Sequence, residues 1–197
     1  MKTILVKILL LFSIVGFSQS ESQNDILISG IVMSEVNNKP LENVTIRINL
    51  SGAISDKKGR FYFKYHADKK DSLKTIVFSA LGYETIDSVI DLRKNKRFKF
   101  NFILKPRFGL NRKKALEEIE NGEIKILISS GIAPVFYKSD SKFSRKYKVK
   151  FVEYGCEAIA YESLYEYNKA VFEFLDKMYG GKWRRKIRKD VIGLVNN

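Results

Sequence analysis

Residues 44–65, VTIRINLSGAISDKKGRFYFKY, decide the fold of the first half of the chain. Apolar and polar side chains alternate from Val44 to Leu50 and again from Phe61 to Tyr65. This alternation is typical of β-strands with one buried face. The DKKG sequence at residues 56–59 favours a turn, because Asp accepts hydrogen bonds from nearby backbone amides and Gly tolerates positive φ. The stretch therefore predicts two strands joined by a hairpin turn.

Further short β-rich runs lie on both sides of this stretch. They cover residues 26–33, 75–80, 85–92 and 98–104. Many short strands at such spacing are typical of a β-sandwich. We therefore expect residues 26–104 to form an all-β sandwich as the first folded module of the chain.

Four motifs in these runs also resemble one known family. They are ISGIV at residues 28–32, KPLENVTI at 39–46, SDKKGRF at 55–61 and FSALGYE at 78–84. In this order they resemble the carboxypeptidase-regulatory-like domain, a transthyretin-like (prealbumin-like) sandwich that also precedes many TonB-dependent outer-membrane transporters. Domains of that family are not catalytic. The resemblance therefore implies a structural or docking module over residues 26–104.

The periodicity changes in the second half of the chain. Residues 105–110 have the composition of a linker, and Asn111 is placed to cap a following helix. Helical patterns and strand patterns then alternate, which is typical of a small α/β domain over residues 111–197. The expected helices cover residues 111–121, 161–179 and 183–191, with a short helical or irregular piece at 142–147, and the expected strands cover 124–129 and 148–154.

Several motifs of this second half resemble the FEKKY domain of exported bacterial proteins. They include FSRKY at residues 143–147, YGC at 154–156, YGGKWR at 179–184 and RKDV at 188–191. Ser144 and Arg145 depart from the stretch that gives the family its name. The resemblance implies a FEKKY-like domain over residues 108–197 and implies no activity.

The N-terminal end of the sequence has the three-part pattern of a secretory signal peptide over residues 1–18. Lys2 and Lys7 precede the apolar run 8–15, which is short for a membrane span. Small residues then precede a cleavage site after Ser18. We therefore expect an exported protein in the periplasm, at the cell surface or outside the cell, with no transmembrane segment after cleavage. An uncleaved membrane anchor is the alternative.

The chain is basic, with a formal net charge of +14 at pH 7. Residues 105–197 hold 20 basic and 12 acidic residues, so most of the surplus lies in the second half. A basic surface favours anionic partners, such as phosphorylated glycolipids or acidic glycans. Because we expect export, nucleic acid is the least expected partner. An unidentified envelope protein remains the other candidate, and the oligomeric state stays open.

The most basic run, KWRRKIRKD at residues 182–190, is the candidate anion-binding site. On a helix, Trp183 and Ile187 share one face that can dock on the domain. The cations then point outward and can hold phosphate groups. The candidate ligands are Lys182, Arg184, Arg185, Arg188 and Lys189. A solvated basic helix without a ligand is the alternative.

The sequence offers no convincing catalytic, metal or cofactor site. Cys156 is the only cysteine and His66 the only histidine, and they lie in different halves. A nucleophilic cysteine needs a neighbouring base, so a small buried thiol is the favoured interpretation of Cys156. No cluster of metal-binding residues and no phosphate-binding glycine loop is present in the sequence. We expect a non-enzymatic protein; an enzyme that uses Cys156 with polar neighbours such as Glu157 is the alternative.

Overall fold

The computed structural model describes residues 24–194, except residues 130, 132, 134 and 136. The predicted signal peptide, residues 1–18, lies outside the described residues. The N-terminal part is built from seven strands: β1 (Asp25–Ser34), β2 (Thr45–Ile48), β3 (Ser51–Ile54), β4 (Arg60–His66), β5 (Leu73–Ser79), β6 (Ile86–Asp91) and β7 (Arg97–Leu104).

These strands form two sheets that enclose one apolar core, which confirms the expected sandwich. One sheet has the order β4-β1-β7 and the other has the order β3-β2-β5-β6. Alternating side chains of β2 and β4 point into the core, as their sequence pattern predicts. Phe78 of β5 lies in the middle, where its ring contacts those of Phe61, Phe100 and Phe102 at centroid separations of 5.8, 6.2 and 4.1 Å.

The structure corrects the hairpin that the sequence predicts between residues 44–50 and 61–65. Strand β2 ends at Ile48, Asn49 turns the chain with a φ of 52°, and Leu50 is fully exposed. The chain returns as β3, a short strand that the sequence pattern does not reveal, because its four residues show no alternation of large apolar side chains. The hairpin therefore joins β2 to β3.

The DKKG turn at residues 56–59 instead carries the chain from one sheet to the other, from β3 to β4. Its local chemistry is as expected. Asp56 Oδ1 accepts hydrogen bonds from the backbone N–H groups of Lys58 and Arg60 at 2.8 and 2.9 Å. Gly59 has a φ of 69°, a conformation that side chains disfavour.

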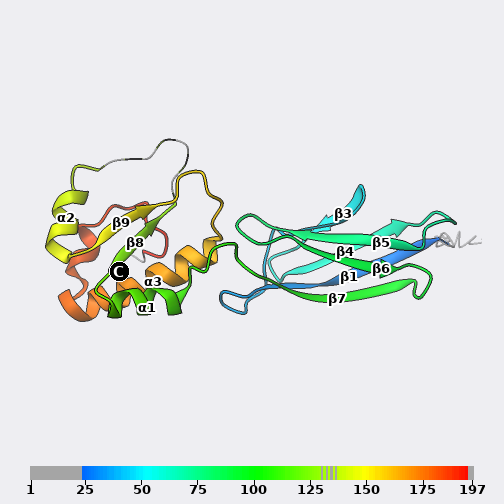
Figure 1. Ribbon diagram of the computed structural model, residues 1–197, viewed down its shortest axis with the longest axis horizontal. Helices are drawn as coiled ribbons and strands as arrows, with labels where there is room; N and C mark the ends of the chain where they lie inside the picture. The colour runs from blue at the N-terminus through cyan, green and yellow to red at the C-terminus, as the bar shows by residue number, and fades with distance from the viewer. Residues whose placement is uncertain (1–23, 130, 132, 134, 136, 195–197) are drawn as a thin grey trace, which may run out of the picture.

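The C-terminal part contains α1 (Arg112–Glu120), β8 (Lys125–Ile128), α2 (Asp140–Tyr147), β9 (Lys150–Glu153), α3 (Tyr161–Tyr179) and a 3₁₀ helix, η1 (Gly181–Arg185). Strands β8 and β9 pair in parallel. Helix α3 packs on α1 and β8, and α2 contacts β9. A second apolar core lies between these elements and includes Tyr167, Phe172 and Trp183. Figure 1 shows this part beside the sandwich along the longest axis of the molecule.

Most sequence predictions for this part agree with the structure. The Asn111 side chain caps α1 by accepting from the backbone N–H of Lys114 at 2.9 Å. Helix α3 has the predicted bounds. No helix in the described part of the chain is long and apolar enough to cross a membrane.

The final helix predicted at residues 183–191 is wrong. Only η1 is helical, and the chain then continues in turns. Trp183 and Ile187 are nevertheless both buried, as expected. The chain leaves the helical conformation near Arg188, whose side chain donates two hydrogen bonds to Asp190. Side chains two residues apart do not face each other on a helix, so this contact requires another backbone conformation.

The predicted linker at residues 105–110 is tied to the sandwich. The backbone carbonyl of Lys105 accepts a hydrogen bond from the N–H of Glu84 at 2.8 Å. The N–H of Arg107 donates to the carbonyl of Gly82 at 3.0 Å. The segment is therefore packed along the loop between β5 and β6. Backbone hydrogen bonds hold its first half in place, unlike in a flexible linker.

The same loop joins the two parts of the molecule. The Tyr83 hydroxyl donates to Glu162 Oε2 on α3 at 2.8 Å and lies 2.8 Å from the Ser34 hydroxyl of β1. Gly82 has a φ of 81°, and a Cβ atom there would lie 2.1 Å from the backbone nitrogen of Ala160. A glycine is therefore required where the loop meets the start of α3.

Candidate functional site

The basic segment, defined here as residues 182–189, is anchored by Trp183. The indole is fully buried and its centroid lies 5.2 Å from that of Phe172. Its Nε1–H donates to Asp176 Oδ1 at 2.9 Å. A buried indole with a satisfied N–H fixes the position of the backbone that carries the neighbouring cations.

Arg184 of the basic segment is engaged by the protein itself. Its Nη2 and Nε donate to Oδ2 and Oδ1 of Asp176 at 2.7 and 3.1 Å. Its guanidinium also lies over the Trp183 ring, 4.8 Å from the centroid. A two-pronged contact with a carboxylate combined with ring stacking is a strong arrangement for arginine. Arg184 therefore helps to hold the segment in place.

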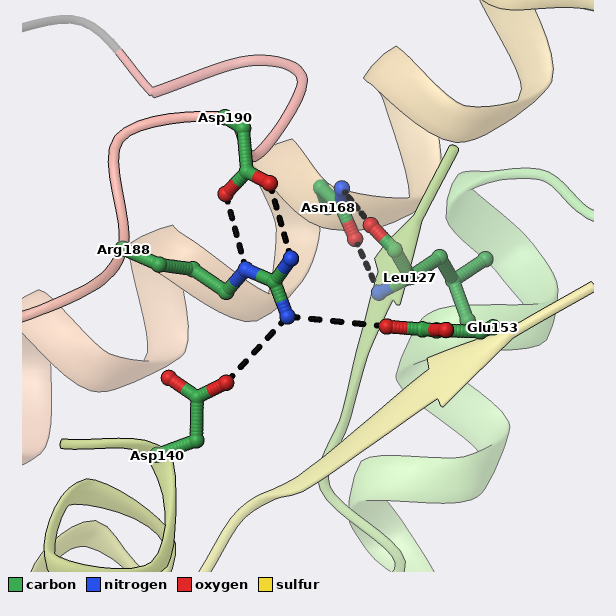
Figure 2. A network of polar contacts seen from close by, with 6 residues as sticks. All are labelled: Leu127, Asp140, Glu153, Asn168, Arg188 and Asp190. Carbon is green, nitrogen blue, oxygen red and sulfur yellow. Dashed lines mark hydrogen bonds and ion pairs between the residues drawn. The ribbon is translucent and has the colours of Figure 1, made fainter. Parts of the chain in front are cut away.

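Arg188 is the most buried cation of the segment, with 3% of its side chain exposed. Figure 2 shows its guanidinium between three carboxylates. Nε and Nη2 donate to the two oxygens of Asp190 at 2.7 and 2.8 Å. Nη1 donates to Asp140 Oδ2 at 3.2 Å and lies 3.5 Å from Glu153 Oε1.

This cluster joins three elements of the C-terminal part. Asp140 begins α2, Glu153 ends β9, and Asp190 follows the basic segment. Hydrogen bonding to Asp190 raises the pKa of Arg188, and the same bonds lower the pKa of Asp190. Both groups are thus charged near neutral pH. Burial of the Arg188 charge is tolerated because its hydrogen-bonding groups have partners. Since these partners come from three elements, the cluster holds the elements together, and we call it the internal brace.

A second buried polar contact, also drawn in Figure 2, lies next to this brace. The Asn168 side chain of α3 accepts from the Leu127 N–H and donates to the Leu127 carbonyl, both at 2.8 Å. It also donates to the carbonyl of Ile192 at 3.0 Å. Asn168 therefore supplies the hydrogen bonds that a further strand would give to the free edge of β8.

The five residues predicted as an anion site do not form one site. Arg184 and Arg188 face carboxylates of the protein. The other three, Lys182, Arg185 and Lys189, are exposed on the surface of the segment. Sequence reasoning could not separate the two groups, because the contacts of Arg184 with Asp176 and of Arg188 with Asp140 form only in the folded chain.

Lys186, which the prediction did not include, lines one cleft together with the lysines of α2. Its neighbours there are Lys142 and Lys146. Their spacing of one helical turn is the only sequence signal that marks these lysines as a pair.

The expectation that Cys156 is buried is wrong. Cys156 is a free, exposed cysteine in the turn after β9, where the N–H of Glu157 donates to the carbonyl of Tyr154 at 3.1 Å. His66 belongs to β4 of the sandwich and lies 3.1 Å from Asp25. No histidine therefore accompanies the thiol. Within the described residues, no group of three or more His, Cys, Asp or Glu side chains is arranged to hold a metal ion.

Comparisons with known proteins identify the N-terminal part. A family model for the CarboxypepD_reg-like domain matches residues 28–111. None of the curated proteins matches the chain. Several solved structures share a weak likeness to it.

The 3-chlorocatechol 1,2-dioxygenase from Rhodococcus opacus 1CP is 12% identical, with a TM-score of 0.32, over 45% of this chain and 62% of that one. The 5-hydroxyisourate hydrolase from Klebsiella pneumoniae is 18% identical, with a TM-score of 0.30, over 41% and 85%. The C-terminal domain of the Caf1A usher is 9% identical, with a TM-score of 0.28, over 42% and 99%.

Likenesses this weak carry no argument about activity. The family match supports the assignment of the sandwich, because it covers the strands that build the sandwich and the loop that carries Gly82 and Tyr83. Residues 28–111, which contain the sandwich, therefore match the CarboxypepD_reg-like domain family.

Proposed function

We propose that the chain is an exported, non-enzymatic binding protein of the bacterial cell envelope. The signal-peptide pattern at residues 1–18 supports export, and the CarboxypepD_reg-like domain supports a docking or structural role for the sandwich. The C-terminal part then presents the surface that recognises an anionic ligand of the envelope.

The C-terminal part in this proposal is an α/β domain over residues 111–197 that folds around its own core. Its apolar cluster is separate from that of the sandwich. Strands β8 and β9 with their helices support an α/β architecture. The motifs at residues 143–147 and 179–184 support a FEKKY-like domain.

The observation that carries the proposal is the rigid display of the exposed cations Lys182, Arg185 and Lys189. They alternate along the basic segment with side chains that anchor it, chiefly Trp183 and Arg188. An anchored cation binds an anionic surface with less loss of conformational freedom than one on a mobile chain. Near an anionic membrane surface each such cation contributes about 1 kcal/mol.

Binding to anionic vesicles tests this proposal. The protein should bind vesicles rich in phosphatidylglycerol at low salt and dissociate as salt rises, because the attraction is screened. Replacing Lys182, Arg185 and Lys189 by Gln should weaken vesicle binding about 100-fold, as the loss of about 3 kcal/mol implies. Arg184 and Arg188 are left intact, since their replacement would disturb the fold.

The matched control replaces Lys57, Lys58 and Lys64 of the sandwich by Gln. These side chains are also exposed, and the change removes the same charge. The control should bind vesicles within about twofold of the unmodified protein, since a distant charge outside the contact is screened over about 10 Å. Equal binding by both triple variants contradicts a role for the basic segment and leaves it as a solvated surface.

A further inference from the structure

A second basic feature lies beside the basic segment, on the exposed side of α2. It is a cleft of about 390 Å³, here called the lysine cleft. Helix α2 supplies most of its wall, and the basic segment closes it with one side chain. The lining residues are Ser139, Lys142, Phe143, Lys146, Tyr147 and Lys186.

Three ammonium groups meet at the lysine cleft. Lys142 and Lys146 are one turn apart on α2, and Lys186 approaches from the basic segment. The charge of Lys146 is the first cause that lowers the pKa of Lys186, and Lys142 and Lys182 add to it. The ion pairs found among the described residues include none of the three lining lysines. In the described part of the chain, no carboxylate therefore forms an ion pair that would offset the repulsion among these three lysines.

Aromatic rings form the floor of the lysine cleft. Phe143 and Tyr147 are both buried against the core, with ring centroids 4.6 Å apart. The Lys146 ammonium lies 5.6 Å from the Tyr147 centroid. Rings packed in this way cannot move aside, so they fix the position of the apolar floor below the charges.

Ser139 adds a hydroxyl to the rim of the cleft. It stands at the N-cap position of α2, yet its side chain makes no capping hydrogen bond to the helix. The hydroxyl can therefore donate to a ligand. The combination of three ammonium groups, one hydroxyl and an apolar floor fits a compact dianion attached to a less polar body.

We propose that the lysine cleft binds a phosphate group, as a phosphate monoester or pyrophosphate. Lys142, Lys146 and Lys186 contact its oxygens, Ser139 donates a further hydrogen bond, and the body that carries the phosphate lies on Phe143 and Tyr147. A bound dianion turns three repulsive contacts into attractive ones. The cleft differs in its residues from the three exposed cations of the proposed function, so each can fail without the other.

Calorimetric titration of the whole protein with inorganic pyrophosphate at low ionic strength tests the cleft directly. We expect saturable binding of one pyrophosphate per chain. The Lys142→Gln, Lys146→Gln double variant should lose about 100-fold or more in affinity, because each of its two charge-assisted hydrogen bonds contributes about tenfold or more. The charge-matched Lys57→Gln, Lys58→Gln variant should bind within about twofold of the unmodified protein.

Thermal melting tests whether the double variant is still folded. Lys142 and Lys146 are exposed and repel each other, so the double variant should melt at the same temperature as the unmodified protein or slightly above it. Should it melt lower, Ser139→Ala and Lys186→Gln replace it as probes, and each must weaken pyrophosphate binding. Absence of saturable binding to the unmodified protein, or equal binding by the cleft and control variants, overturns the proposal.

Vesicles distinguish the two sources of the phosphate group. Phosphatidic acid carries a phosphate monoester, whereas phosphatidylglycerol carries a diester. If the phosphate is lipid-borne, the protein prefers phosphatidic acid at equal surface charge, and the cleft double variant loses that preference. If pyrophosphate binds but both vesicles bind equally, the ligand is a soluble phosphate compound. The proposed function fails separately, through the Lys182, Arg185 and Lys189 variant.

Discussion

The two parts of the molecule differ in how their cores are stabilised. The sandwich buries alternating apolar side chains. Its buried polar residues are Ser34, which is hydrogen-bonded to the Tyr83 hydroxyl, and Ser55, which donates to the Leu41 carbonyl. The C-terminal part buries Asn168 and Arg188, which reach across several elements. A local pattern in the sequence thus specifies the first core, while the second depends on polar contacts between distant residues.

This difference decides how each part should respond to substitution. Removing an apolar side chain costs its transfer energy and the cavity that remains. Removing one partner of a buried polar contact also leaves the other partner without hydrogen bonds, which costs further stability. The C-terminal part should therefore be the more sensitive of the two to single polar changes.

The largest effect is expected for Trp183→Ala. The substitution empties the centre of the second core and removes the N–H donor to Asp176. The free energy of unfolding of the C-terminal part should fall by about 3–5 kcal/mol. Thermal melting followed by circular dichroism measures the loss, with Trp183→Phe as the milder control. An unchanged melting temperature would show that the indole does not hold the basic segment.

A smaller loss, about 3 kcal/mol, is expected for Arg188→Met, at the lower end for a broken buried ion pair because Asp190 keeps some contact with water. Three carboxylates then share one site without a cation. Arg185→Met is the matched control, because Arg185 is exposed in the same segment. It should change stability by less than about 0.5 kcal/mol. Equal effects of the two substitutions contradict the brace.

The smallest effect is expected at the joint between the two parts. Tyr83→Phe removes the hydroxyl that donates to Glu162 and lies beside Ser34. Burial raises the pKa of Tyr83 above its ordinary value, so this donor keeps its proton at neutral pH. The loss should be about 1 kcal/mol. Tyr62→Phe, an exposed ring on β4, is the control in denaturant unfolding and should leave stability unchanged.

The sequence predicts most strands of the sandwich, because short β-rich runs, some with clear alternation, mark them locally. It fails at β3, where Ser51, Gly52 and Ala53 carry too little apolar surface to show a pattern. It also misses the β2–β3 hairpin, because Leu50 fits the apolar register of the strand while lying at an exposed turn. Exposure at a turn is set by the neighbouring strands and leaves no local sign.

The candidate site is less predictable for the same physical reason. Arg188 and Asp140 are 48 residues apart, and Tyr83 and Glu162 are 79 residues apart. Only the fold brings such pairs together. The basic run at residues 182–189 is visible as a charge cluster, yet the sequence does not tell which cations the protein uses internally. Whether Cys156 is buried likewise depends on the tertiary structure. The general preference of thiols for burial predicts a buried residue, but Cys156 is exposed.

Hydrogen–deuterium exchange of the Arg188→Met variant tests most directly whether the two parts are stabilised separately. Mass spectrometry of peptides reports exchange along the chain, and amides open with the free energy of the unit that holds them. We expect faster exchange in α1, β8, α2, β9 and α3, with the amides of β1 to β7 exchanging as in the unmodified protein. Equal acceleration in the sandwich and in the C-terminal part would contradict two separate cores and show one cooperative unit.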